Sequence, residues 1–146
     1  MPFITTETLI LVADAGRAML LANEGTALAP RLVQRALLTA PEPALASDRP
    51  GRMPDPGPGH RSALEQTDAG RVAAEALAAE VAEALAKALR AGKGRRLVLV
   101  APPQMLGALR DRLAPPVRAA VAAELSKTLT NHPLPKIAAL VEEALG

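Results

Sequence analysis

The segment from Ser47 to Glu65 constrains the fold of this chain more than any other part of it. The segment is rich in glycine and proline, and its prolines are Pro50, Pro54, Pro56 and Pro58. Because proline fixes φ and has no backbone N–H to donate, neither a helix nor a central strand can run through such a segment. A long connection without secondary structure is uncommon in a compact domain and is usually functional or disordered. We therefore predict an extended loop over about residues 40–67 and look there first for a functional site.

The length and composition of the chain indicate one domain, residues 1–146, with an aliphatic core. The chain has 146 residues, which suffice for one core. Hydrophobic residues make up 49% of it, with Phe3 as the single aromatic residue. The stacking of bases on aromatic side chains, common in proteins that bind single-stranded nucleic acid, is therefore not available. The absence of cysteine excludes disulfides, thiolate catalysis and cysteine-based zinc sites.

The charge distribution gives little indication of a partner. The formal net charge is +2, and no block of like charges is present that would predict a polybasic tail. The first seven residues contain no basic residue, and the apolar run Leu9–Ala13 is too short for a signal or membrane segment. We expect a cytoplasmic protein without membrane insertion, and its oligomeric state is left open.

Hydrophobic patterning predicts an order of strands and helices. Short apolar runs bounded by turn residues predict strands over 8–13, 17–22, 32–38 and 97–101. The strongest helix is predicted over Asp68–Ala91, because Leu77, Val81, Leu85 and Leu89 recur at i, i+4 spacing. Further helices are expected from about 102 to 113 and from Pro133 or Pro135 onward. Between them, residues 117–125 are expected to form a short helix that runs into a strand near 121–127.

This order predicts an α/β fold with a mixed sheet. Three antiparallel N-terminal strands followed by βα units imply that helices pack on the faces of the sheet. The arrangement resembles the ribonuclease-H-like class. A two-metal nuclease of that class needs several carboxylates that converge on the metal ions, but Asp14, at the end of the first strand, is the only acid so placed. We interpret Asp14 as a turn-forming residue and expect neither a metal nor a cofactor.

Other catalytic patterns are also incomplete. The serines Ser47, Ser62 and Ser126 and the histidines His60 and His132 are available, but none of the serines stands in a Gly-x-Ser-x-Gly elbow. Ser62 and Glu65 match a capping box, which indicates the start of a helix. The pair Gly57 and Gly59 has neither a preceding strand nor a following lysine, so no phosphate-binding loop is predicted.

Five separated segments resemble the bacterial host attachment proteins, which are required for attachment to host cells. The segments are Leu11–Arg17, Ser47–Arg52, Gly57–Glu65, Leu97–Pro103 and Glu124–Thr130. They occur in the same order as in the family and cover nearly the whole chain. The name of the family describes a phenotype and implies no biochemical activity.

That family in turn resembles the central domain of archaeo-eukaryotic class-1 release factors and their Pelota relatives. In the release factors, a loop with a Gly-Gly-Gln motif precedes a long helix and positions a water on the ester of peptidyl-tRNA. The matching stretch here is Gly57–Leu64, in which His60 replaces the second glycine and Arg61 the glutamine. The resemblance therefore implies a loop that contacts RNA without hydrolysis, since arginine suits phosphate recognition.

We accordingly expect a non-catalytic binding module that contacts tRNA or ribosomal RNA through the 47–61 loop. The candidate loop residues are Asp48, Arg49, Arg52, His60, Arg61, Ser62 and Glu65, and the candidate turn residues are Asp14 and Arg17. Lys87, Arg90, Lys93, Arg95 and Arg96, around the end of the long helix, are either further phosphate contacts or a solvated helix terminus. Two alternatives remain: a regulatory factor for surface attachment that binds a protein partner, and a small hydrolase that uses His60.

Overall fold

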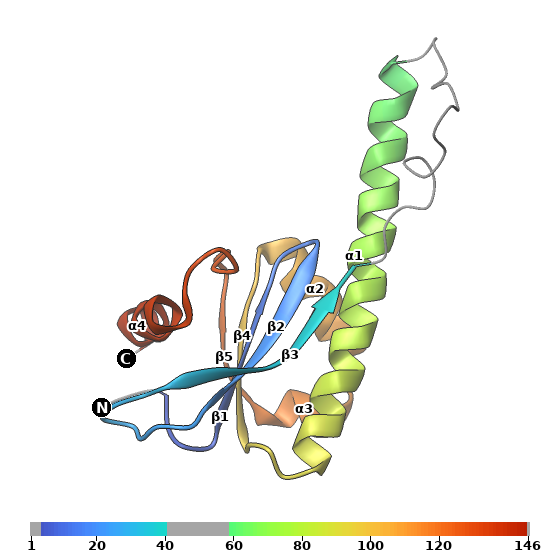
Figure 1. The fold of residues 1–146 in the computed structure, drawn as a ribbon. Helices are drawn as coiled ribbons and strands as arrows, with labels where there is room; N and C mark the ends of the chain where they lie inside the picture. Colours follow the sequence, from blue (N-terminus) through green and yellow to red (C-terminus); the bar gives the residue numbers. More distant parts are fainter. Residues whose placement is uncertain (1–3, 41–58, 146) are drawn as a thin grey trace.

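The residues that the structure describes form an α/β arrangement of five strands and four helices (Figure 1). The structure is a computed structural model that describes residues 4–40 and 59–145, with the backbone alone for residues 59–70. The elements are β1 (Thr8–Ala13), β2 (Arg17–Asn23), β3 (Leu32–Thr39), α1 (Gly59–Arg90), β4 (Arg96–Val100), α2 (Pro103–Arg112), α3 (Pro115–Ala120), β5 (Val121–Leu125) and α4 (Leu134–Leu145). Apart from the start of α1, their bounds differ from the predicted ones by about two residues or fewer.

The five strands form one mixed sheet in the order β3-β2-β1-β4-β5. β2 is antiparallel to both β1 and β3, whereas β1, β4 and β5 run parallel to one another. The mixed α/β class predicted from the sequence is therefore confirmed, and the ribonuclease-H-like assignment stays a prediction. The carboxyl ends of the three parallel strands lie on the same side of the sheet. We call this side, which runs across the ends of the strands and not along an outer strand, the C-terminal edge.

Helices cover both faces of the sheet and bury two separate apolar clusters (Figure 1). Because side chains alternate along a strand, Leu9 and Leu11 of β1 point to one face and Ile10 and Val12 to the other. The first face packs against α1, α2 and α3, and the second packs against α4. This double burial explains why β1 and β4 are apolar at almost every position rather than at every second one.

The predicted loop over 40–67 is wrong in its last part, because α1 begins at Gly59 and not at Asp68. Pro58 is the last proline of the segment, so nothing after it prevents a helix. The apolar stripe used for the prediction appears only where a helix packs against something. Among the described side chains of α1, residues 71–90, Leu77, Val81 and Leu85 are fully buried. The stripe that predicted the helix consists of residues from this part, so it did not report where the helix begins.

The first part of α1, residues 59–72, extends beyond the sheet on the side of the C-terminal edge (Figure 1). We call it the α1 arm, and at 1.5 Å per residue it is about 20 Å long. Val72, in its last turn, is 63% exposed, whereas Leu77 is fully buried. At the base of the arm, Arg112 of α2 donates from Nε to the backbone oxygen of Glu75 at 3.2 Å and pairs with its carboxylate at 3.5 Å.

A pair of truncations on α1 tests where the helix leaves the body of the protein. Leu77→Ala removes a buried side chain from the first cluster and should lower the free energy of unfolding by about 2–5 kcal/mol. Val72→Ala, on the arm, should change it by less than about 0.5 kcal/mol. Urea unfolding followed by circular dichroism measures both. A similar large loss for the two variants would show that the arm packs against the rest of the chain.

Candidate functional site

The C-terminal edge collects the ends of several chain segments that are distant in sequence. β1, β4 and β5 end there, and β2 begins there at Arg17. β3 also ends there, since the backbone N–H of Ala40 donates to the oxygen of Gly16 at 2.8 Å. In open α/β sheets, this is the side on which ligands usually bind. The α1 arm extends beyond the same side (Figure 1).

Asp14 organises the turn between β1 and β2. Its Oδ1 accepts hydrogen bonds from the backbone N–H groups of Gly16 at 2.7 Å and Arg17 at 2.9 Å. The backbone N–H of Asp14 donates in turn to the oxygen of Arg17 at 2.9 Å. A short acidic side chain that binds the backbone two and three residues ahead stabilises a tight turn.

A second segment, residues 126–133, is bound to this turn, and we call it the edge strap. Thr130, which is only 4% exposed, donates from Oγ1 to Oδ2 of Asp14 at 2.6 Å. The guanidinium of Arg17 donates to the backbone oxygen of Thr130 at 2.7 Å and to Oδ1 of Asn131 at 3.2 Å. Asp14, Arg17, Thr130 and Asn131 together form what we call the Asp14 cluster.

The edge strap runs along the C-terminal edge from β5 back to β1. At its start, the backbone oxygen of Leu125 accepts from Ala101 N–H at 3.1 Å and from Lys127 N–H at 3.0 Å. At its other end, Thr130 reaches β1 through Asp14. Since β4 lies between β1 and β5, the strap crosses the end of β4. Within the strap, the side chain of Leu129 is buried, whereas the side chains of Lys127 and His132 are exposed.

The carboxylate of Asp14 is held in its charged form. Burial alone would raise its pKa, but the hydrogen bonds from Thr130, Gly16 and Arg17 and the charge of Arg17 together lower the pKa below its ordinary value. A carboxylate that accepts three hydrogen bonds and keeps its charge is suited to holding a turn and a strap together. Within residues 4–40 and 71–145, whose side chains the structure describes, no three histidine or carboxylate side chains gather in a way that could hold a metal ion.

The structure places the residues predicted from the sequence in different surroundings. Asp48, Arg49 and Arg52 lie outside the described residues. His60, Arg61, Ser62 and Glu65 lie in the first two turns of α1, on the arm, and not in a loop. Asp14 and Arg17 are brought together in the Asp14 cluster. The binding roles of all these residues stay predictions.

Thr130 and Asn131 were not predicted as site residues. Thr130 belongs to one of the segments that carry the family resemblance, but nothing in its spacing indicates a contact with a turn 116 residues earlier. A side-chain hydrogen bond between distant segments has no sequence period. The resemblance was the only signal that singled out this segment.

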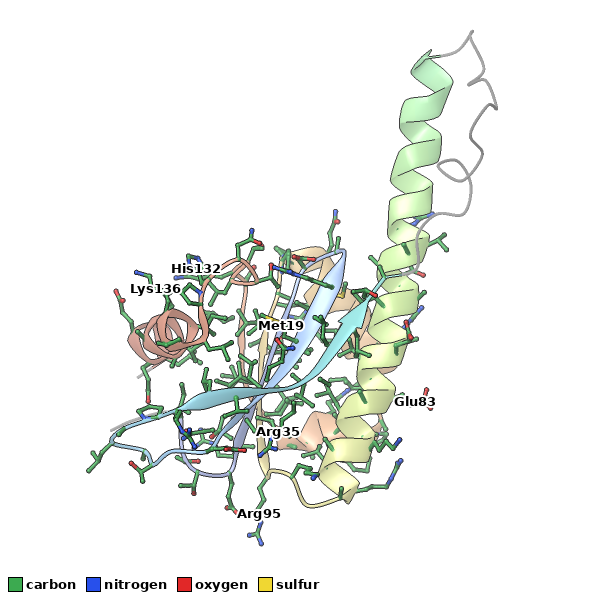
Figure 2. All side chains as sticks on the ribbon, in the orientation of Figure 1. Met19, Arg35, Glu83, Arg95, His132 and Lys136 are labelled. Atoms are coloured by element: carbon green, nitrogen blue, oxygen red, sulfur yellow. The ribbon has the colours of Figure 1, made fainter. Side chains whose placement is uncertain are left out.

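The basic residues at the C-terminal end of α1 lie at the opposite end of the molecule from the arm. Lys87 and Arg90 are in the last turn of α1, and the backbone N–H of Arg95 donates to the oxygen of Glu7, which precedes β1. Figure 2 shows Arg95 at the opposite end of the sheet from His132. With about 46 Å of helix between Gly59 and Arg90, these residues and the tip of the arm belong to different surfaces.

Substitution of Asp14 tests its role in fixing the turn and the strap. Asp14→Ala removes the acceptor for three hydrogen bonds and should lower the free energy of unfolding at neutral pH by about 1–3 kcal/mol. Asp14→Asn keeps an acceptor for the backbone N–H groups and should lose less. Urea unfolding at neutral pH compares the two variants.

The same variants predict a pH dependence. Because the pKa of Asp14 is lowered from its ordinary 3.8 in the folded state, its stabilisation is complete above about pH 3.8 and is lost as the pH falls through the lower folded-state pKa. The Asn variant should lack this part of the acid destabilisation. Parallel curves of unfolding free energy against pH for the wild type and the Asn variant would contradict the assignment.

Comparison with known proteins gives one family and a fold. A family model described as "Protein required for attachment to host cells" matches residues 9–141. Among solved structures, the crystal structure of an archaeal translation termination factor, aRF1, is similar with a TM-score of 0.53 and 13% identity, over 94% of this chain and 34% of that one. Dom34 of S. cerevisiae, a translation termination-like factor, gives 0.45 and 12% over 97% and 37%. No curated protein matches.

The likeness to aRF1 supports the fold alone, because the identity is low and this chain spans about a third of the length of that protein. It agrees with the mixed sheet described above. Among the described residues, no helix is long and apolar enough to cross a membrane.

Proposed function

The chain belongs to the family of proteins required for attachment to host cells, and from this premise we propose that it is a non-catalytic binding module for tRNA or ribosomal RNA. The observation that carries the proposal is the α1 arm, which extends beyond the sheet (Figure 1). A helix that extends past the core of its own protein can meet a partner away from that core. Residues 47–61, which lead into this end, are the segment that the sequence indicated as a binding element.

The residue types at the tip of the arm suit phosphate groups. Arg61 lies in the first turn of α1, which contains no acidic residue. Arg49 and Arg52 precede it in the chain, and guanidinium groups bind phosphates in a fixed, two-pronged geometry. The partial positive charge at a helix N-terminus acts in the same direction.

Two observations favour binding over catalysis. His60 and Arg61 stand where the resembling release factors have the Gly and Gln of their motif, so the group that would orient a water is missing. The Asp14 carboxylate, at the C-terminal edge, already accepts three hydrogen bonds from its own chain. A fully bonded, charged carboxylate is a poor general base. A solved structure similar to this chain is that of a translation termination factor, which makes RNA of the translation machinery the first partner to test.

Co-sedimentation with purified ribosomes and binding of unfractionated tRNA, each over a range of salt concentrations, test the proposal. The arm variant replaces Arg49, Arg52 and Arg61 with glutamine. Its control replaces Lys87, Arg90 and Lys93, which removes the same charge at the other end of α1. Wild-type affinity should fall steeply with salt, and the slope of log affinity against log salt should shrink by about 0.7–0.9 for each phosphate that the arm variant no longer binds.

The control variant should keep the wild-type salt dependence. Wild-type protein that binds neither ribosomes nor tRNA at low salt would overturn the proposal, and so would equal losses in the two variants. A pull-down that recovers one protein partner without RNA would support the alternative of a regulatory factor for surface attachment.

A further inference from the structure

We infer that the C-terminal edge of the sheet is a second contact surface for the phosphate backbone of the same RNA that binds the α1 arm. The surface consists of Arg17, Lys127, His132 and Lys136, which we call the edge cations. The inference rests on the proposed function and extends it from the arm to the body of the protein.

The edge cations come from segments that the fold brings to the same side. Arg17 begins β2 at the C-terminal edge and is bonded to the strap through Asn131. Lys127 lies two residues beyond the end of β5 and is exposed. His132 and Lys136 are exposed at the start of α4, where Figure 2 shows them near each other.

The C-terminal edge has an excess of positive charge. Residues 101–104 and 125–136, which contribute to it, contain no aspartate or glutamate. Next to these segments, among the described residues, Asp14 supplies a negative charge, and its carboxylate is bound to the turn and to Thr130. Arg17, Lys127 and Lys136 therefore carry three positive charges against the one negative charge of Asp14. In the 47–61 segment, by comparison, three arginines are offset by two aspartates, so the edge adds positive charge to that of this segment.

The two lysines of this surface are not neutralised by neighbouring acids. Among the described residues, no carboxylate lies within ion-pair distance of Lys127 or Lys136. Several arginines elsewhere on the protein do pair with glutamates; they are Arg31, Arg35, Arg95, Arg110 and Arg112. When a lysine neutralises a phosphate, the counterion condensed on that phosphate is released, and this release favours binding.

The backbone that carries these cations is fixed before any partner binds. The 2.6 Å bond between Thr130 and Asp14 and the bonds of Arg17 to the strap hold its middle. The backbone N–H of His132 donates to the oxygen of Leu129 at 3.1 Å, and that of Ile137 donates to Pro133 at 3.0 Å. A surface held in this way loses little backbone entropy on association, which strengthens binding.

The arm and the edge cations lie at the same end of the molecule, so one RNA can contact both. The arm extends past the C-terminal edge (Figure 1), so the arm and the edge lie at the same end of the sheet. Lys87 and Lys93 lie at the other end of the sheet, next to the C-terminus of α1, where the helix dipole is negative. They give a matched control, because both are exposed lysines on the same protein.

The test is the salt dependence of binding to fluorescein-labelled unfractionated tRNA, measured by fluorescence anisotropy on the full chain. The edge variant is Lys127→Gln with Lys136→Gln, and the control is Lys87→Gln with Lys93→Gln. Neither lysine of the edge variant makes a side-chain hydrogen bond with a described residue, so this variant should unfold at the wild-type temperature. The edge variant should lose about 1.4–1.8 from the slope of log affinity against log salt, and the control should lose none.

The outcomes separate this inference from the proposed function. If wild-type protein does not bind RNA at low salt, the proposed function fails and the inference fails with it. If the wild type binds, the arm variant weakens binding and the edge variant keeps the wild-type slope, the edge inference alone is overturned. Loss of a protein partner by the edge variant, with RNA binding unchanged, would also overturn it and would assign the edge to a protein contact.

Discussion

Burial of β1 on both faces of the sheet is the constraint on which the rest of the structure depends. Every residue of β1 is at most 1% exposed, so a helical layer is needed on each side. α1, α2 and α3 provide one layer and α4 the other. β1 also pairs with β2 on one side and β4 on the other, which places its end, and therefore Asp14, in the middle of the C-terminal edge. The position of the candidate site thus follows from packing.

The edge strap connects β5 to α4, and hydrogen bonds to Asp14 and Arg17 hold this connection in one conformation. The chain must return from β5, at one margin of the sheet, to α4 on the second face, and it does so along the C-terminal edge. Polar groups of this connection would be costly to bury without partners, and the Asp14 cluster supplies them for Thr130. These hydrogen bonds hold Thr130 in its buried position. Lys127 and His132, on either side of Thr130 in the sequence, are exposed.

Much of the fold, but little of the candidate site, could be predicted from the sequence. β1, β2 and β4 were predicted because a short apolar run between turn residues is typical of a buried strand, and Asp14 was rightly interpreted as a turn residue. The start of α1 was missed because the prediction rested on the stripe of Leu77, Val81, Leu85 and Leu89, which lies in the C-terminal half of the helix. Thr130 and Asn131 were missed because their contacts join segments distant in sequence, and such contacts depend on topology rather than on local spacing.

α1 is one continuous helix from the sheet to the tip of the arm, so a change in the direction of its packed part also moves the tip. The packed part, around Leu77 and Leu85, sets its direction, and Arg112 contacts it at Glu75, just below the arm. Because the arm extends about 20 Å beyond this contact, a tilt of about 10° at its base would carry the tip roughly 4 Å sideways. Small changes in packing between α1 and α2 are therefore magnified at the end of the arm, far from where they arise.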